Sequence, residues 1–153
     1  MCAATTNQEP GINNDALVDG RRATSTTCYT DGSVKNVQKL SMLHRNFNAF
    51  YSLDATDNFG WKLAALGDID GDGVVDLVVG VQWDDDGGSN AGALYVLSLE
   101  TNGNVKNAQK ISMLYGNFNT FYTLDEHDGF GLSMAALGDL DGGGVADLAV
   151  SER

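Results

Sequence analysis

Apolar residues along the chain occur in short runs, and clusters of glycine, aspartate and asparagine separate these runs. The clearest run, residues 74–81, is rich in β-branched valine and contains no proline. Such runs between turn-forming residues are typical of buried β-strands. The pattern predicts four consecutive strands in the middle of the chain, near residues 60–67, 75–81, 92–99 and 105–114. We therefore expect an all-β fold.

The second half of the chain repeats the first at a distance of 71 residues. Residues 32–80 and 103–151 are identical at roughly 30 of the 49 aligned positions. Repetition at a fixed period is typical of architectures in which each unit packs against its neighbours. Asp31-Gly32 and Asn102-Gly103 fall at equivalent places, where their tolerance of positive φ predicts tight turns between strands.

A loop with four aspartates connects the first two predicted strands of the middle unit. Asp68, Asp70, Asp72 and Asp76 stand at relative positions 1, 3, 5 and 9. Alternating carboxylates on a curled loop suit a hard cation with oxygen ligands, above all Ca²⁺. We predict that these side chains and the carbonyl of Val74 bind calcium. A solvated acidic turn without an ion is the alternative, although four carboxylates exceed what a turn requires.

The residues around this loop exclude a helix–loop–helix calcium site. Such a site needs a bidentate Glu at position 12, where this chain has Val79, and a helix on each side. The loop is therefore predicted to be the turn of a β-hairpin. Its copy in the third unit has Gly143 in place of the third carboxylate, so calcium binding there is expected to be weaker or absent. The predicted ligands of the copy are Asp139, Asp141, Asp147 and the carbonyl of Val145.

Further motifs surround the aspartate loop. Phe59-Gly60 precedes it, and a Gly-Ala-x-Tyr-Val segment at residues 92–96 closes the unit. With the loop itself, Asp76-Leu77 and Gly80, these motifs resemble the FG-GAP family, the repeat of the integrin α-subunit β-propeller. The resemblance covers about residues 20–150. It implies four-stranded antiparallel blades, calcium as a structural ion in the hairpin loops, and an adhesion or protein-binding module at the cell surface or outside the cell.

Matching the chain to blades of this kind predicts its organisation. The expected parts are a poorly ordered lead-in at 1–20, the outer half of a first blade at 21–58, a complete blade at 59–129 and the truncated inner half of a third at 130–153. A propeller closes with about four to eight blades. We therefore expect a segment of a larger protein, or self-association through the open blade ends. The apolar residues expected to lack a neighbour are Leu40, Leu43, Leu137 and Val150.

Composition restricts the choice of partners. The formal net charge is −12 and the pI is near 4.2, which argues against binding to nucleic acid or to anionic membranes. No apolar run approaches the roughly 18 residues of a membrane helix, and no signal-peptide pattern is visible at the start. Cys2 and Cys28 match no metal motif, and whether they pair is left open.

No catalytic motif stands out in the sequence. There is no Gly-x-Ser-x-Gly elbow, no phosphate-binding glycine loop and no zinc-type spacing, so we expect a binding module rather than an enzyme. One alternative is carbohydrate recognition, with Trp83, Tyr51 and Tyr122 as candidate residues for stacking on sugar rings. Another is an accessory domain of a polysaccharide-acting enzyme. The acidic segment 83–91 is interpreted as a solvated connection rather than a second ion site.

Overall fold

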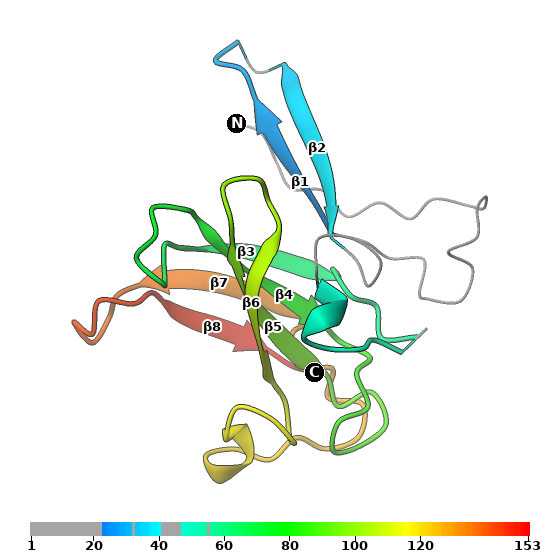
Figure 1. Cartoon of the computed structure of the whole chain (residues 1–153). Helices are drawn as coiled ribbons and strands as arrows, with labels where there is room; N and C mark the ends of the chain where they lie inside the picture. Colours follow the sequence, from blue (N-terminus) through cyan, green and yellow to red (C-terminus); the bar gives the residue numbers. More distant parts are fainter. Residues whose placement is uncertain (1–22, 32, 41–46, 55) are drawn as a thin grey trace.

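Eight β-strands and two short 3-10 helices make up the regular structure of the described residues (Figure 1). The computed structural model describes residues 23–31, 33–40, 47–54 and 56–153. Predictions for residues 1–22 and 41–46, for Cys2 and for the Cys28 side chain lie outside this description. The elements are β1 (Ala23–Cys28), β2 (Val34–Leu40), η1 (Phe47–Ala49), β3 (Lys62–Gly67), β4 (Asp76–Val81), β5 (Ala93–Leu99), β6 (Val105–Ile111), η2 (Phe118–Thr120), β7 (Ser133–Gly138) and β8 (Asp147–Ser151). The prediction of an all-β fold is confirmed.

Strands β3 to β6 form one antiparallel sheet in the order of the sequence. Its inner strands β4 and β5 are buried along nearly their whole length, and Val79 pairs with Tyr95 in register. The four strands predicted from the apolar runs are therefore confirmed. The last one ends at Ile111 rather than at residue 114, because Ser112 and Tyr115 exchange backbone hydrogen bonds that close a turn.

The two faces of this sheet bury separate apolar clusters. On one face Val79 and Val81 pack with Tyr95, while on the other Val78 packs with Leu94. Successive side chains of a strand point to opposite faces, so the valine-rich run of β4 supplies both clusters at once. A strand covered on both sides is apolar at nearly every position, which explains why β4 shows no polar alternation after its first residue, Asp76.

The connections rich in aromatic residues contribute rings to these clusters. The ring of Phe47 in η1 is fully buried and lies 4.9 Å from Phe59 and 5.3 Å from Tyr95. Its copy Phe118 in η2 lies 4.7 Å from Phe130 on the other face. Each connection thus covers the face where two units meet. By contrast, Phe121 is exposed to solvent.

The expectation that the apolar residues at the open blade ends lack a packing neighbour within the chain holds only in part. Leu40 is 1% exposed and belongs to the cluster of Phe47 and Phe59, so the prediction for it is wrong. Val150 packs against the second cluster, whereas Leu137 is about half exposed. The cluster that buries Leu40 combines Phe47 from its own unit with Phe59 and Tyr95 from the next unit.

Adjacent units approach each other closely along the backbone. The two-stranded sheet β7–β8 lies beside the central sheet, with β7 next to β3 (Figure 1). Gly92 forms a parallel bridge with Phe130, whose N–H donates to the Ala91 carbonyl at 2.8 Å. A Cβ atom on Gly92 would collide with the Phe130 backbone, and φ at Gly92 is +92°. Glycine at this position therefore lets the second and third units share backbone hydrogen bonds.

Candidate metal centre

One carboxylate shapes the loop between β3 and β4. Asp68 Oδ1 accepts hydrogen bonds from the backbone N–H groups of Gly71 at 2.7 Å and Asp72 at 3.0 Å. Its Oδ2 accepts a third, from Gly73 at 2.7 Å. An aspartate that gathers successive N–H groups in this way stabilises a tight turn. The first position of the predicted calcium loop therefore also determines how the loop curls.

A second carboxylate ties this loop to the sheet. Asp76 begins β4, and its side chain is fully buried. Its Oδ2 accepts from the N–H of Ile69 in the loop, and its Oδ1 accepts from the N–H of Leu99 at the end of β5, both at 2.9 Å. One side chain thus connects the hairpin loop with the strand on the far side of β4.

Three of the predicted ligands come together. Oxygens of Asp68, Asp70 and Asp76 all lie within 4.8 Å of one another. Oxygens that share one Ca²⁺ at 2.3–2.6 Å lie at most about 5 Å apart. The three carboxylates therefore fit a single calcium ion, and their all-oxygen chemistry matches this hard cation.

The fourth predicted carboxylate points elsewhere. Asp72 Oδ2 lies 2.8 Å from Lys106 Nζ, which is also 2.9 Å from Asp70 Oδ2, while Asp72 Oδ1 accepts from the N–H of Val74. The hydrogen bond from Lys106 lowers the pKa of Asp72, and the same contact raises the pKa of Lys106. Lys106 supplies the counter-charge that the acidic loop needs. To reach the other three carboxylates, the side chain of Asp72 has to leave Lys106.

The sequence alone does not indicate that Lys106 contacts the aspartate loop. It lies 34 residues from Asp72 and is the second residue of β6, the fourth strand of the sheet. Only the antiparallel order of β3 to β6 brings the start of β6 to the end of the sheet that holds the loop.

The loop of the third unit repeats this arrangement. Asp139, Asp141 and Asp147 also place oxygens within 4.8 Å of one another. Asp147 Oδ2 accepts from the N–H of Leu140 at 2.7 Å, as Asp76 does from Ile69. At the place of Asp72 the chain has Gly143, whose N–H donates to Asp141 Oδ1 at 2.8 Å. This second candidate site thus has three carboxylates and no fifth-position side chain.

A comparison with known protein families agrees with this geometry. The family model described as the FG-GAP repeat matches residues 59–97. These residues are an FG-GAP repeat. The match begins at Phe59 and ends inside β5, and the sheet β3–β6 is accordingly a β-propeller blade. A search of curated proteins finds no match to the chain.

The motif that names the FG-GAP family has a packing role here. Phe59 is buried among Phe47 and Tyr95, and Gly60 adopts a positive φ of 85° that favours glycine. The pair therefore anchors the entry to β3 against the core. Proteins with this repeat are typically extracellular, and the described residues contain no helix long and apolar enough to span a membrane.

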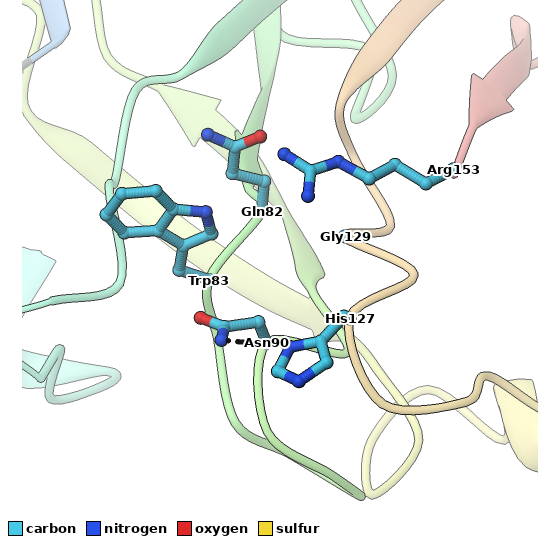
Figure 2. A pocket seen from close by; sticks show the side chains of 6 residues that line it. All are labelled: Gln82, Trp83, Asn90, His127, Gly129 and Arg153. Carbon is cyan, nitrogen blue, oxygen red and sulfur yellow. Dashed lines mark hydrogen bonds between the residues drawn. The ribbon is translucent and has the colours of Figure 1, made fainter.

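The three candidate stacking aromatics lie in different surroundings. Trp83 is 39% exposed and borders a pocket of about 50 Å³ (Figure 2). Tyr51 packs 5.3 Å from Tyr95, and Tyr122 donates to Glu152 at 2.6 Å. Figure 2 shows the pocket between the loop that follows β4, the segment of His127 and Gly129, and Arg153 after β8. The residues that line it are Gln82, Trp83, Asn90, His127, Gly129 and Arg153.

The acidic segment after β4 is more than a solvated connection. Asp84 is only 3% exposed, and Asp84 Oδ2 lies 2.7 Å from the nitrogen of the buried Lys110. Lys110 also pairs with Asp86 Oδ2 at 2.6 Å, and Ser112 donates to the same oxygen at 2.8 Å. The prediction of a solvated loop is therefore wrong for Asp84. The sequence could not reveal this, because the partner of Asp84 comes from β6.

Proposed function

We propose that this chain is a calcium-stabilised FG-GAP propeller segment that acts as an adhesion or protein-binding module outside the cell or at its surface. The observation that carries the proposal is the convergence of Asp68, Asp70 and Asp76 within 4.8 Å, in the hairpin loop of an FG-GAP repeat. The same convergence in the loop of Asp139 supports a family of equivalent sites, one per blade.

Calcium at this loop would have a structural role. It would neutralise carboxylates whose mutual repulsion otherwise opposes the curled loop. Asp68, Asp70 and Asp76 would hold the ion, and Asp72 and the carbonyl of Val74 would complete the shell once Lys106 is displaced. Because Asp76 also accepts from Leu99, the ion would tie the hairpin more firmly to β5. We propose no catalytic step for this site.

The ligand-binding test compares two aspartate variants. Calcium binding to the wild-type chain is measured by calorimetry, with an expected Kd on the order of 10⁻⁴ to 10⁻⁶ M. Asp70→Ala removes a candidate ligand that accepts no hydrogen bond from the loop backbone, so we expect affinity to fall on the order of tenfold. Asp125→Ala, which removes an exposed carboxylate outside both loops, serves as the control of equal charge. Equal calcium affinity of the two variants would reject the site.

Carbohydrate recognition is the second candidate function, and the pocket beside Trp83 favours it. An exposed indole next to amide, imidazole and guanidinium groups is a surface that can stack on a sugar ring and bind its hydroxyls. At about 50 Å³ the pocket would hold only the edge of one sugar. A glycan array with wild type and Trp83→Ala tests this function. Binding that is lost in Trp83→Ala would favour a lectin-like role, and an array without signal would leave the protein-binding role.

A further inference from the structure

We propose that the open edge of β8 binds the β1–β2 hairpin of a second copy of this chain, which completes the third blade. β1 and β2 form a sheet of their own, and so do β7 and β8. Among the described residues, β1 and β8 each therefore have one unpaired edge. An edge strand offers a row of backbone N–H and C=O groups that can pair with a strand of another chain.

The internal repeat identifies β1–β2 as the half that the third blade lacks. At the offset of 71 residues, β1 and β2 are the copies of β5 and β6, while β7 and β8 are the copies of β3 and β4. Both outer hairpins have a register shift at the same place, between Thr27 and Cys28 and between Ser98 and Leu99. β7–β8 followed by β1–β2 thus has the strand order of the complete blade, and only the pairing of β4 with β5 has no counterpart.

The complete blade also supplies the register of the missing pairing. Val78 of β4 pairs with Val96 of β5 in antiparallel strands. The copies of these residues are Ala149 in β8 and Ser25 in β1. β4 is buried at nearly every position, whereas none of the five residues of β8 is fully buried. A docked hairpin would give β8 the cover that β5 gives to β4.

One carboxylate oxygen has an unused place for this contact. In the complete blade, Asp76 Oδ1 accepts from the N–H of Leu99 at 2.9 Å. Its copy Asp147 accepts from Leu140 with Oδ2, and no N–H group of the described residues donates to its Oδ1. The proposed register brings the N–H of Cys28, the copy of Leu99, to this oxygen.

The two surfaces are also complementary in charge. Lys106 of β6 pairs with Asp70 at 2.9 Å in the middle unit. The copies of these residues are Lys35 in β2 and Asp141 in the loop of the third unit. In the described part of the chain, no lysine or arginine forms an ion pair with the three carboxylates of that loop. Lys35 of a second copy would supply the counter-charge, which favours this partner over an unrelated strand.

An aromatic side chain beside the third blade lacks the cover that its copy has. The ring of Tyr51 lies 5.3 Å from Tyr95 in β5. Its copy Tyr122 is 50% exposed and bonds to the exposed end of the chain at Glu152. The residue of β1 equivalent to Tyr95 is Thr24. Docking would place β1 over the Tyr122 ring, so this exposed ring lies where the hairpin is proposed to bind.

The proposed contact joins different surfaces of the two copies. Each copy uses β8 for one neighbour and β1–β2 for another, so the contact is heterologous and builds rings or open filaments. Each copy then contributes one complete blade and one shared blade. A ring of about two to four copies would contain the four to eight blades of a closed propeller.

The test cross-links the proposed register. Both natural cysteines are replaced, by Cys2→Ser and Cys28→Ser, and the single variants Ser25→Cys and Ala149→Cys are made in this background. Opposite residues of antiparallel strands have Cα atoms about 4.5–5.5 Å apart, within the range of a disulfide. An equimolar mixture should therefore form a covalent dimer under mild oxidation, visible on a non-reducing gel. Each chain carries one cysteine, so the dimer can form only between copies.

Matched controls test the register itself. Thr26→Cys replaces Ser25→Cys in a second mixture, and its side chain points to the other face of the strand. Each single variant is also oxidised alone. We expect several-fold more dimer from the mixture of Ser25→Cys and Ala149→Cys than from any control. Equal yields, or no dimer from this mixture, would overturn the proposal.

The assay buffer contains EDTA, so the outcome does not depend on calcium binding, and circular dichroism confirms that each variant is folded. Sedimentation of the wild-type chain is the second measurement. Its average mass should rise above the 16.2 kDa of one chain as the protein concentration increases. A single species of that mass over the whole concentration range would also overturn the proposal.

Discussion

Replacement of Asp76 tests how far one carboxylate holds the blade together. We expect Asp76→Ala to destabilise the folded chain much more than Asp147→Ala, its equivalent in the third unit. Asp76 accepts hydrogen bonds from Ile69 and Leu99, and its side chain is fully buried. Asp147 accepts from Leu140 and is partly exposed. The two positions share the loop motif and differ in the bond to a third strand.

The size of the effect follows from these bonds. A hydrogen bond to a charged group contributes about 1.5–3 kcal/mol, and a buried donor left without a partner adds to the loss. Loss of two such bonds predicts about 3–6 kcal/mol for Asp76→Ala, compared with roughly 1–2 kcal/mol for the single, more exposed bond of Asp147. Relief of repulsion with Asp68 and Asp70 offsets little, since both are exposed to solvent. Total stabilities of 5–15 kcal/mol make the larger loss easy to detect.

Urea unfolding followed by circular dichroism measures both variants against wild type. The first series contains EDTA, so that the difference reports the hydrogen bonds and not a bound ion. A second series in millimolar calcium should widen the gap, because Asp76 belongs to the loop with four carboxylates, whereas Asp147 belongs to the loop with Gly143, where we expect weaker calcium binding. Equal losses for the two variants in EDTA would refute the reasoning, since the bond to Leu99 would then contribute nothing measurable.

Three further changes test other parts of the structure. Lys106→Met should bind calcium more tightly than wild type, because Lys106 competes with the ion for Asp70 and Asp72. Calorimetry measures the affinity, the control Lys62→Met should leave it unchanged, and weaker binding by Lys106→Met would contradict the prediction. Gly143→Asp should create a tighter second calcium site, with Asp141 turning away from the new side chain, and an unchanged titration would count against it. Burial raises the pKa of Asp57 to about 7, so the folded state binds this proton more tightly than the unfolded state does. As the pH rises from 4 to 7, the free energy of unfolding of the wild type should therefore fall relative to that of Asp57→Asn. Urea unfolding at several pH values measures both, and the same pH dependence in the two proteins would disprove this.

The hairpin loop was predictable because its structure is local. Asp68 bonds to N–H groups within five residues of itself, and Asp76 to that of Ile69 seven residues away. The apolar runs predicted the strands for a related reason. A strand buried on both faces is apolar at nearly every position, as β4 is after Asp76, and turn-forming residues mark its ends.

Interactions between distant segments were not predictable in the same way. The bonds of Lys106 to Asp72, of Asp76 to Leu99 and of Lys110 to Asp84 span 34, 23 and 26 residues. No periodicity encodes such a pairing, because either partner alone is compatible with a solvated position. The burial of Leu40 was missed for the same reason, since its cluster includes Phe59 and Tyr95 from the next unit.

The sequence by itself determined the repeat, the order of the strands and the residues of the hairpin loops, since each of these depends on neighbours along the chain. The tertiary structure decided which carboxylates converge, which one Lys106 draws away, and where charge is buried without compensation. These outcomes depend on the antiparallel order and register of β3 to β6, which bring residues far apart in sequence to the same end of the sheet. Electrostatic interactions act over a few ångströms in space, so their partners emerge only once the sheet has formed.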